Sequence, residues 1–539
     1  MSFRLTVQLI NLFLFLFLLG AAISIGSTAF PVDLYLRMDP ALVLFTVLSA
    51  RVFLLAFIPS LIVLAAALIL GRVFCSHFCP MGTTLELIGK VRLWGKKRKG
   101  LPTYLSRIKY LLLGFLLGGS FLGVSWVFIA SPLSLITRFY GIFIYPLLSL
   151  AGESGLTVIR PLAEKIGWTG LVYSRIAVPV FSTQLFILSF FFALFILEGF
   201  FPRFWCRILC PAGAMLALFS RRPLIRRKVA GSCTDCGKCV RACPMSAIES
   251  ESIKTIRFPE CIVCSTCEKI CPEKAISFPG TRVEKEPKAQ NLYPERRQFL
   301  LAGAAGALTA VSGLTGLDGP KATGKVGKID HDPMLRPPAA LPEAEFLARC
   351  VRCGECLAAC PTNTLQPVWF ESGVMGLFSP KLTPRIGYCD PHCHQCALVC
   401  PTGAIAFLSA EERLWVKTGT AVIYKEKCLA WEQKKGCMVC DEVCPYKAVE
   451  FRFQEGNPVP VPEVHEERCS GCGYCEHFCP VKPEKAIIIS PNGAIRLAKG
   501  SYIEAAKKLG LDLSLKQASQ GVLPSDTKPL SPSRAPGFD

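Results

Sequence analysis

The chain has 539 residues, of which 28 are cysteine, and 51% of its residues are hydrophobic. At about 150 residues per domain the length allows three or four domains, so cysteines are not needed to staple a small fold. A mean hydropathy of +0.41, together with long apolar stretches, excludes a purely soluble protein and a disordered one. A formal net charge of +20 ordinarily indicates nucleic acid or anionic lipid as a partner, an interpretation that other features of the sequence weaken.

Four apolar stretches reach the length of about 20 residues that a membrane helix needs. They cover residues 5–26, 52–71, 108–130 and 178–199. No small-residue cleavage site ends a short apolar core in the first stretch, so we expect an anchor rather than a signal peptide. Lysine and arginine concentrate between the second and third stretches and after the fourth. This distribution predicts that both basic segments face the cytoplasm.

The second and fourth stretches run into the same Cys-x3-Cys-Pro motif. Cys75 and Cys79 recur 131 residues later as Cys206 and Cys210. The repeat predicts two similar halves, with each pair at i, i+4 on one helix face and the four thiols converging between the halves. Three interpretations are open for these cysteines: a seventh metal site, a redox-active thiol–disulfide pair, or inert packing residues.

The other 24 cysteines form six quartets, each ending in Cys-Pro. Four quartets have the regular spacing Cys-x2-Cys-x2-Cys-x3-Cys-Pro, namely Cys233, Cys236, Cys239 and Cys243; Cys261, Cys264, Cys267 and Cys271; Cys350, Cys353, Cys356 and Cys360; and Cys469, Cys472, Cys475 and Cys479. Two quartets have a longer first gap, namely Cys389, Cys393, Cys396 and Cys400; and Cys428, Cys437, Cys440 and Cys444. In this spacing three cysteines surround one iron–sulfur cube, and the fourth reaches the neighbouring cube.

The quartets therefore predict six [4Fe-4S] clusters with these 24 cysteines as ligands. Zinc is the alternative for a four-cysteine site, and the two altered gaps also allow a [3Fe-4S] cluster or changed ligation. We expect Cys243 to bind the cube of the second quartet and Cys271 that of the first. Among the last four quartets, nested pairing (first with fourth, second with third) is preferred to sequential pairing, because the first and fourth are the regular ones.

Residues around the quartets add smaller expectations. An apolar side chain follows each Cys-Pro and predicts packing beside each cluster: Ile248, Ile276, Leu365, Ile405, Val449 and Ile487. His392 and His394 flank Cys393, where we expect surface histidines, with cluster ligation or tuning as the alternative. His77 is expected to form local hydrogen bonds, because Ile208 takes its place in the second Cys-x3-Cys-Pro motif.

The clusters also change the interpretation of the charge. An oxidised [4Fe-4S] cluster with four thiolates carries a net 2−, so six of them reduce the formal charge to about +8. Membrane topology and lipid headgroups account for the remaining basic residues, and nucleic-acid binding is the disfavoured alternative.

A basic pair separates the first two quartets from the last four. Residues 295–301 have the sequence Glu-Arg-Arg-Gln-Phe-Leu-Leu, and an Ala/Gly-rich apolar stretch follows to Leu317. A twin arginine before a mildly apolar stretch is typical of a Tat export signal, with an ordinary anchor or surface helix as the alternative. No clear cleavage site follows, so we expect an uncleaved fifth span, with the four-cluster domain outside.

The resulting fold class is an α-helical membrane bundle of four spans in two repeats, with an expected fifth span, plus α+β bacterial-type [4Fe-4S] ferredoxin domains. The expected domains are a membrane domain (1–228), a two-cluster domain (229–285), a signal or anchor helix with linker (286–344), a four-cluster domain (345–490) and a partly disordered tail (491–539). One tension follows from this topology, because electrons cannot hop across a hydrocarbon core about 30 Å thick without an intermediate carrier.

Two sets of motifs together carry a family resemblance. The four apolar stretches, the two Cys-x3-Cys-Pro motifs and the first two quartets resemble NapH-type membrane ferredoxins, which share this membrane motif with NosR-like and CcoG-like proteins. The twin arginine and the last four quartets resemble NapG/MauM-type polyferredoxins. The chain looks like a fusion of the two. The resemblance implies quinol oxidation and delivery of electrons to a periplasmic reductase or cytochrome, and in the MauM setting a link to methylamine oxidation.

We therefore expect an electron-transfer component of a prokaryotic inner membrane, which oxidises quinol and relays electrons through six [4Fe-4S] clusters. Its partners would be the membrane, the quinone pool and a periplasmic redox protein, without nucleic acid. The sequence contains no P-loop, G-x-G-x-x-G or HExxH motif to support a self-contained enzyme. The alternative function is a redox assembly factor for a partner metalloenzyme that uses the thiols of the Cys-x3-Cys-Pro motifs.

Overall fold

The computed structural model describes residues 3–24, 31–90, 103–221, 223–249, 253–279, 293–314, 334–369, 371, 373–513 and 515. It divides the chain into two units, each built from several segments. Unit 1 consists of Met1–Tyr140, Gln184–Asp318 and Ala348–Cys353, and unit 2 of Gly141–Thr183, Gly319–Leu347 and Gly354–Asp539. Unit 1 thus joins the apolar helices and the first two quartets, which the sequence had suggested were separate domains.

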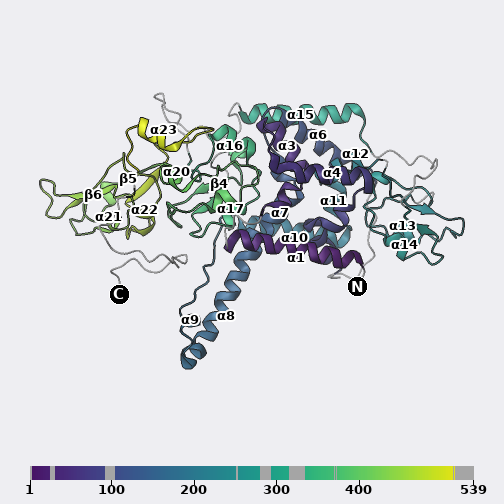
Figure 1. Cartoon of the computed structure of the whole chain (residues 1–539), viewed down its shortest axis with the longest axis horizontal. Coiled ribbons are helices and arrows are strands. Elements are labelled where there is room, and N and C mark those ends of the chain that lie inside the picture. The colour runs from purple at the N-terminus through teal and green to yellow at the C-terminus, as the bar shows by residue number, and fades with distance from the viewer. Residues whose placement is uncertain are drawn as a thin grey trace. The chain divides into compact units, whose positions relative to one another are not determined.

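Apolar helices form most of unit 1 (Figure 1). They are α1 (Phe3–Ser24), α2 (Leu34–Arg37), α3 (Pro40–Ala50), α4 (Ile58–Leu70), α5 (Pro80–Lys90), α6 (Ile108–Phe121), α7 (Pro132–Arg138), α10 (Gln184–Phe200), α11 (Phe204–Ile208) and α12 (Pro211–Phe219). Four of these helices begin at a proline, which suits the first helical position because its missing N–H would have no partner there. Capping residues precede three of them; Asp39, for example, accepts from the N–H groups of Ala41 and Leu42 before α3.

The predicted spans are all represented by helices, but most of these helices are shorter than expected. The third stretch ends as α6 at Phe121, and the second is a 3-10 turn (Leu55–Phe57) followed by α4. Among the described residues only Phe3–Ser24 and Pro132–Ile166 are long and apolar enough to cross a membrane by themselves. The second of these, which includes α7 and α8 (Tyr145–Ile166), lies between the third and fourth predicted stretches. Four membrane spans therefore remain a prediction.

The twin-arginine segment forms α15 (Arg296–Leu314), which lies along α6 (Figure 1). Glycines on both helices make this approach close. A Cβ atom at Gly118 would lie 1.9 Å from the carbonyl oxygen of Gly303, and one at Gly306 would lie 1.9 Å from that of Phe115. Small residues of this kind let two helices pack backbone to backbone in an apolar environment.

The first two quartets lie in a small α+β region of unit 1. Its strands β1 (Lys228–Val229) and β2 (Ile276–Ser277) pair antiparallel, and a bridge joins Ile248 to Ile256 between them. Helices α13 (Lys238–Ala242) and α14 (Thr266–Lys269) each carry one cysteine of a quartet, Cys239 and Cys267. The outer strands therefore bring together the start and the end of the two-quartet segment.

Unit 2 repeats this plan. Strand β5 (Thr420–Ile423) pairs with β8 (Ile487–Ser490) on the outside, and β6 (Val449–Arg452) pairs with β7 (Val461–Val464) as an inner hairpin. An earlier copy has a bridge between Ala340 and Ile405 outside and the pair β3 (Leu365–Pro367) and β4 (Pro380–Leu382) inside. The remaining helices of unit 2 are α8, α9 (Thr169–Val172), α17 (Glu355–Ala358), α18 (Gly373–Gly376), α19 (Gln395–Leu398), α20 (Ala410–Leu414), α21 (Val439–Glu442), α22 (Tyr474–Phe478) and α23 (Tyr502–Lys508), and α16 (Glu343–Arg349) crosses the division between the units.

The four-cluster region extends beyond both of its predicted limits. On the N-terminal side, buried Arg336 donates to Glu343, whose carboxylate also accepts from Arg496 (Oε2 to Nη1, 3.0 Å). On the C-terminal side, Tyr502 and Leu513 are fully buried. These residues were expected to belong to a linker and a tail. The rest of the predicted linker and tail lies outside the described residues.

Candidate functional site

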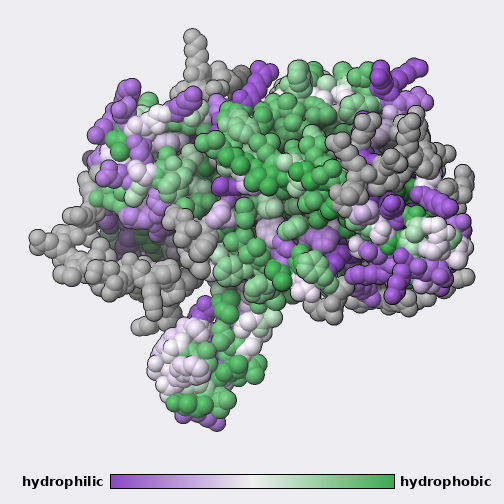
Figure 2. All heavy atoms as spheres, turned by 45° about the vertical axis from the view of Figure 1, so that its right-hand side comes forward, coloured by the Kyte–Doolittle hydropathy of each residue, from purple (hydrophilic) through white to green (hydrophobic). Residues whose placement is uncertain are grey.

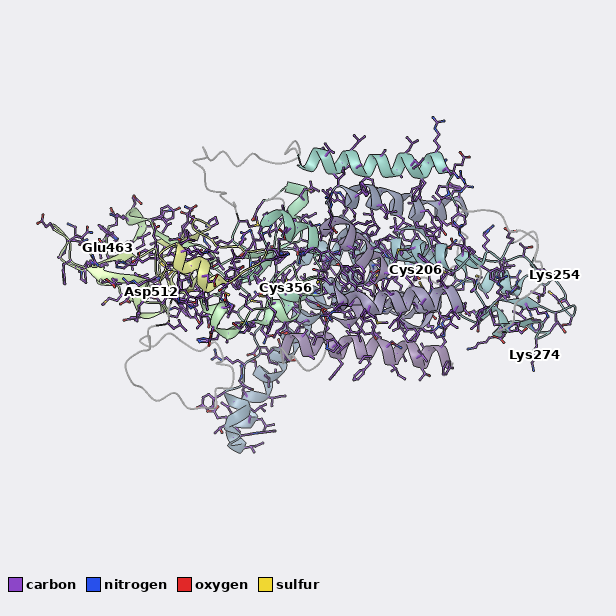
Figure 3. The ribbon with its side chains drawn as sticks, turned by 45° about the horizontal axis from the view of Figure 1, so that its top comes forward. Cys206, Lys254, Lys274, Cys356, Glu463 and Asp512 are labelled. Carbon is purple, nitrogen blue, oxygen red and sulfur yellow. The ribbon has the colours of Figure 1, made fainter. Side chains whose placement is uncertain are left out.

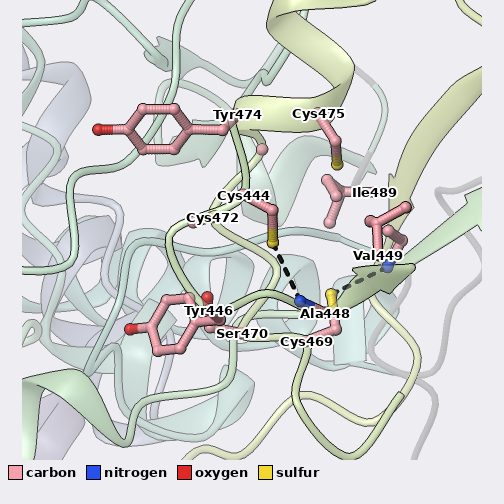
Figure 4. Close-up of a pocket in the computed structure, with 12 residues that line it drawn as sticks. Cys444, Tyr446, Ala448, Val449, Cys469, Ser470, Cys472, Tyr474, Cys475 and Ile489 are labelled. Carbon is pink, nitrogen blue, oxygen red and sulfur yellow. Dashed lines mark hydrogen bonds between the residues drawn. The ribbon is translucent and has the colours of Figure 1, made fainter. Parts of the chain in front are cut away.

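Four cavities are each lined by four cysteines. In every case three cysteines come from one quartet and the fourth comes from its neighbour. The sets are Cys261, Cys264 and Cys267 with Cys243 in unit 1, and, in unit 2, Cys389, Cys393 and Cys396 with Cys360; Cys428, Cys437 and Cys440 with Cys479; and Cys469, Cys472 and Cys475 with Cys444. Figure 4 shows the last of these cavities. The exchange of the fourth cysteine is the arrangement expected of two-cluster ferredoxins.

The cavities show that the last four quartets pair sequentially. Cys360 of the first joins the second, and the third and fourth exchange Cys444 and Cys479. The nested pairing preferred from sequence is therefore wrong. The physical reason lies in the connections, because the inner pairs β3–β4 and β6–β7 each lie between two consecutive quartets, whatever the regularity of their spacing.

The remaining ligands of the quartets are placed less completely. Cys239 and Cys271 pack with the same hydrophobic core as the cavity of unit 1, together with Cys243 and Cys261. Cys350 and Cys353 belong to unit 1, whereas Cys356, labelled in Figure 3, and Cys400 belong to unit 2. The ligand sets that involve Cys233, Cys236 and Cys350 stay predictions.

The residues of the cavities fit a [4Fe-4S] cluster. Backbone N–H groups point at cysteine sulfurs, from Ala247 to Cys243 (3.4 Å) and from Ala448 to Cys444 (3.3 Å). These equivalent bonds in the two units suit anionic sulfur. Four cysteines from two neighbouring quartets, with backbone donors to their sulfurs, are the ligand set that a [4Fe-4S] cluster takes.

The six apolar residues that follow the Cys-Pro pairs are at least 96% buried: Ile248, Ile276, Leu365, Ile405, Val449 and Ile487. Four of them, Ile248, Leu365, Val449 and Ile487, line the cavities and keep water from them, as the sequence predicts. Burial also raises the pKa of the Cys389 thiol to about 12, so ligation by iron, which displaces the proton, is what holds this group as a thiolate.

A basic side chain donates to the carbonyl of a cysteine at every one of the four cavities. In unit 1, Arg4 Nη1 donates to Cys264 (3.3 Å). In unit 2 the donors are Arg413 to Cys393 (3.0 Å), Lys417 to Cys469 (2.6 Å) and Lys485 to Cys479. These cations place positive charge beside groups that are anionic in every redox state, and such charge favours the reduced state. Sequence reasoning missed all four, because the positions share no motif.

Arg413 also explains how the first altered quartet keeps its shape. The gap between Cys389 and Cys393 contains one extra residue, whose backbone carbonyl needs a donor. Arg413 Nη2 donates to the backbone carbonyl of Asp390 in this gap (3.0 Å) and to the sulfur of Cys389 (3.2 Å). Arg413 is buried. Burial alone would lower its pKa, but the nearby Cys389 and Cys396 raise the pKa above the usual value.

The long gap of the second altered quartet is a folded loop. The N–H of Glu432 donates to the carbonyl of Cys428 (2.8 Å), and the N–H of Lys435 donates to that of Leu429 (3.0 Å). Trp431 Nε1 closes the loop on Pro462 (3.2 Å). Cys428 can therefore line the same cavity as Cys437 and Cys440 despite its distance in sequence.

His77 and His392 lie where the sequence led us to expect them, whereas His394 is partly buried. His392 is exposed, and neither it nor His394 lines the cavity of Cys389. The pKa of His394 lies below its usual value, because burial and the nearby charge of Arg413 disfavour the protonated ring. His77 Nδ1 forms a hydrogen bond with Ser76 Oγ (2.6 Å).

The Cys-x3-Cys-Pro pairs are not i, i+4 neighbours on continuous helices. Cys75 lies in a π-helical turn (Phe74–Phe78), and Cys79 has an extended backbone before α5. Cys206 lies in α11, and Cys210 is the extended N-cap of α12. The prolines cause this break, because the residue before a proline is driven out of the helical region.

Comparisons with known proteins agree with these sites. A family model described as a 4Fe-4S binding domain matches residues 50–102 and 183–230. Two models described as 4Fe-4S dicluster domains match residues 232–276 and residues 349–404 and 435–482. No solved structure matches the chain.

Curated relatives include three ferredoxin-type proteins. The chain is 38% identical over 169 residues to the methylamine utilization ferredoxin-type protein MauM of Methylorubrum extorquens, which is 29% of this chain and 72% of that protein. It is 35% identical over 176 residues to the ferredoxin-type protein NapG of Escherichia coli, covering 31% and 73%. It is 36% identical over 219 residues to NapG of Haemophilus influenzae, covering 38% and 72%.

Proposed function

The chain belongs to the family of ferredoxin-type proteins that includes MauM and NapG, and from this premise we propose that it takes electrons from quinol in a membrane and delivers them to a redox partner. At the level of protein class, the chain is an iron–sulfur electron-transfer protein. The finer proposal adds a NapH-like membrane part, six clusters, quinol as donor and an acceptor on the far side of the membrane.

Exposed apolar side chains on the helices of unit 1 support a membrane location. Phe13 on α1 and Phe192 on α10 are 72% and 64% exposed, and Ile62 on α4 and Leu308 on α15 are exposed to similar degrees. Figure 2 shows a broad area of hydrophobic residues on the face in view. A soluble protein rarely leaves so many large apolar side chains in water, whereas lipid tails would cover them.

The observation that carries the proposal is the position of cysteine segments at both ends of α6. Near its N-terminal end, Lys109 and Tyr110 bind Glu260, the residue before Cys261. Just beyond its C-terminal end, the carbonyl of Ser125 accepts from Arg352 Nη1 (3.1 Å). Arg352 lies between Cys350 and Cys353 in the sequence.

The length and surroundings of α6 support a transmembrane arrangement. Its 14 residues span about 21 Å, much of the apolar thickness of a bilayer. Basic residues near the N-terminal end, with Arg107 and Arg226 among the described ones, favour the cytoplasm for the first two clusters. The later clusters would then face the periplasm, in a prokaryotic inner membrane.

The chain's own residues have simple tasks in this function. A [4Fe-4S] cluster supplies a site that gains and loses one electron without moving atoms far. Cysteine thiolates hold it, buried apolar residues such as Ile248 and Val449 keep water away, and cations such as Arg413 offset its charge. No general acid or base is required at these sites.

The proposal is tested on the full chain, purified anaerobically in detergent. A menaquinol analogue should reduce a large share of the clusters that dithionite reduces, seen as loss of visible absorbance and as new EPR signals. The matching quinone is the control and should reduce none. Clusters that respond to dithionite alone would contradict quinol oxidation. If a partner metalloenzyme then failed to mature without this chain, the assembly function would replace it.

A further inference from the structure

Four cysteines belong to no ferredoxin-type quartet, and unit 1 brings them together. The four are Cys75, Cys79, Cys206 and Cys210, of which three are buried and Cys75 is partly buried. Arg203, three residues before Cys206, donates to the carbonyl of Cys75, and Arg72, three residues before Cys75, lies beside Gly213, whose N–H donates to Cys210. Figure 3 shows Cys206 among the helices of unit 1. We propose that these four cysteines bind one further iron–sulfur cluster, in addition to those of the quartets.

The two halves of the site have the same construction. In each half the first cysteine sits in a short turn and the second precedes the N-terminus of a longer helix, α5 or α12. The N–H of Gly213 donates to Cys210 Sγ (3.2 Å), and Gly82 takes the equivalent position after Cys79. Backbone N–H groups also meet ligand sulfurs in the ferredoxin-type cavities, so the sulfur environment is shared.

Glycine is required at the equivalent position of each half. A Cβ at Gly82 would lie 2.9 Å from the carbonyl oxygen of Cys75 and 3.1 Å from Arg203 Nη1. A Cβ at Gly213 would lie 2.8 Å from Arg72 Nη2 and 3.4 Å from Cys210 Sγ. Each half therefore leaves room beside its own cysteines for the arginine of the other half.

The two arginines are placed crosswise. Arg203 Nη1 donates to the carbonyl of Cys75 (2.9 Å), which is the same contact that a cation makes with a cysteine at each ferredoxin-type cavity. Arg72 has no exposed surface, and its Nε and Nη2 atoms have no hydrogen-bond partner among the described residues. A buried guanidinium edge without a partner is costly, and an anionic cluster beside Cys206 and Cys210 would supply the missing acceptor.

The surrounding charges suit an anion. Arg72 and Lys109 share Glu260, and Arg203 and Arg4 share Glu86. Lys90 also approaches Glu86 (3.9 Å), and the buried Glu198 accepts from the backbone N–H groups of Arg203 and Phe204. The basic side chains around the site still outnumber the acidic ones, which suits an anionic cluster with four thiolates.

A comparison with known families favours a cluster over a single ion or a disulfide. The model described as a 4Fe-4S binding domain matches residues 50–102 and 183–230, whose cysteines are these four and no others.

The site also has a neighbour to exchange electrons with. Cys75 packs against the hydrophobic core that contains Cys239 and Cys267, and Arg4 links Glu86 to the carbonyl of Cys264. A cluster here would adjoin the first ferredoxin-type region and extend it into the helices. This role deepens the proposed function, but occupancy of the site does not depend on quinol being the donor.

The test compares the full chain with a Cys79→Ala/Cys210→Ala variant, both purified anaerobically. Iron and acid-labile sulfide should each fall by about two to four per chain, according to the cluster type, while the signals of the other clusters persist. The control is Ser220→Ala, a buried change beside α12, which should leave the iron content unchanged. Equal iron in the double variant and the control would overturn the proposal.

A second measurement keeps the proposal falsifiable if the double variant does not fold. Wild-type protein is denatured in the presence of an alkylating reagent, and the four cysteines are mapped by mass spectrometry. All four should be alkylated as free thiols, and iron should exceed the about 24 atoms of six quartets. A disulfide among the four, or about 24 irons, would overturn the proposal whether or not quinol reduces the protein.

Discussion

The ferredoxin-type cavities and the four-cysteine site of the helices hold their cysteines in different ways. In a cavity such as that of Cys469, Cys472 and Cys475, three sulfurs come from one short loop, and one residue from the neighbouring quartet completes the set. The helical site takes two pairs that lie 131 residues apart and depends on how whole helices pack. Local spacing therefore identifies the first kind of site, whereas only tertiary structure reveals the second.

The largest effect is expected when iron is counted in double variants that test which cysteines share a ferredoxin-type cavity. Cys360→Ala with Cys389→Ala should lose about four irons per chain, because both cysteines line one cavity. Cys360→Ala with Cys469→Ala should lose about eight, because two clusters are affected.

Nested pairing of the quartets predicts the opposite result: about eight irons lost from the Cys360/Cys389 double variant and about four from the Cys360/Cys469 double variant. Exposed Met438 provides the control, since Met438→Leu lies between two ligands and should leave iron unchanged. A loss of about eight irons from the first double variant would reject sequential pairing.

A substitution at the contact between α15 and α6 tests whether the helical region depends on helix packing. Gly306→Leu places a large side chain where even a Cβ atom would lie 1.9 Å from the carbonyl oxygen of Phe115 on α6, and it should separate the two helices. Protease sensitivity near α15 should rise, and the thermal stability of unit 1 should fall, while the cavities of unit 2 keep their EPR signals. Gly155→Leu, where nothing lies near the added Cβ, is the matched control. Loss of all clusters together would contradict the independence of the two regions.

A smaller effect is expected where unit 2 binds its own N-terminal segment. Glu343 accepts from Arg336 and Arg496, and Glu343→Gln would leave the buried Arg336 without its counter-charge. The free energy of unfolding should fall by about 1–3 kcal/mol, measured by chemical denaturation under anaerobic conditions. Glu371→Gln, which changes the exposed carboxylate of the Lys381–Glu371 pair, should change it by less than about 1 kcal/mol. Equal effects of the two variants would show that the segment is not held by this pair.

The smallest change concerns the potential of a single cluster. Arg413→Gln removes positive charge beside Cys389, so the cluster of that cavity should become harder to reduce, by tens of millivolts. An EPR-monitored redox titration measures the shift, and exposed Arg452→Gln is the control. A potential equal to that of the control variant would mean that Arg413 only supports the enlarged loop.

These cases show what the sequence could supply. The cysteine spacing predicted the exchange of the fourth ligand, and the apolar residues after each Cys-Pro are buried as expected, because both depend on a few adjacent residues. Pairing of the quartets was missed, since it depends on the strands that lie between them. The contacts of Arg413 and Arg72 were also missed, because each reaches its site from a distant element. The break in the helix at Cys79 was missed because the i, i+4 spacing of the cysteines was given more weight than the effect of the proline that follows them.

The central claim is that electrons enter at the helices and reach the C-terminal clusters. Freeze-quenched EPR after addition of a menaquinol analogue tests it most directly, with the Cys475→Ala difference spectrum identifying the cluster of that cavity. We predict that quinol reduces this cluster in the wild type and that Cys79→Ala/Cys210→Ala slows or abolishes its reduction. Its reduction at the wild-type rate in the double variant, or no reduction by quinol in either protein, would contradict the account.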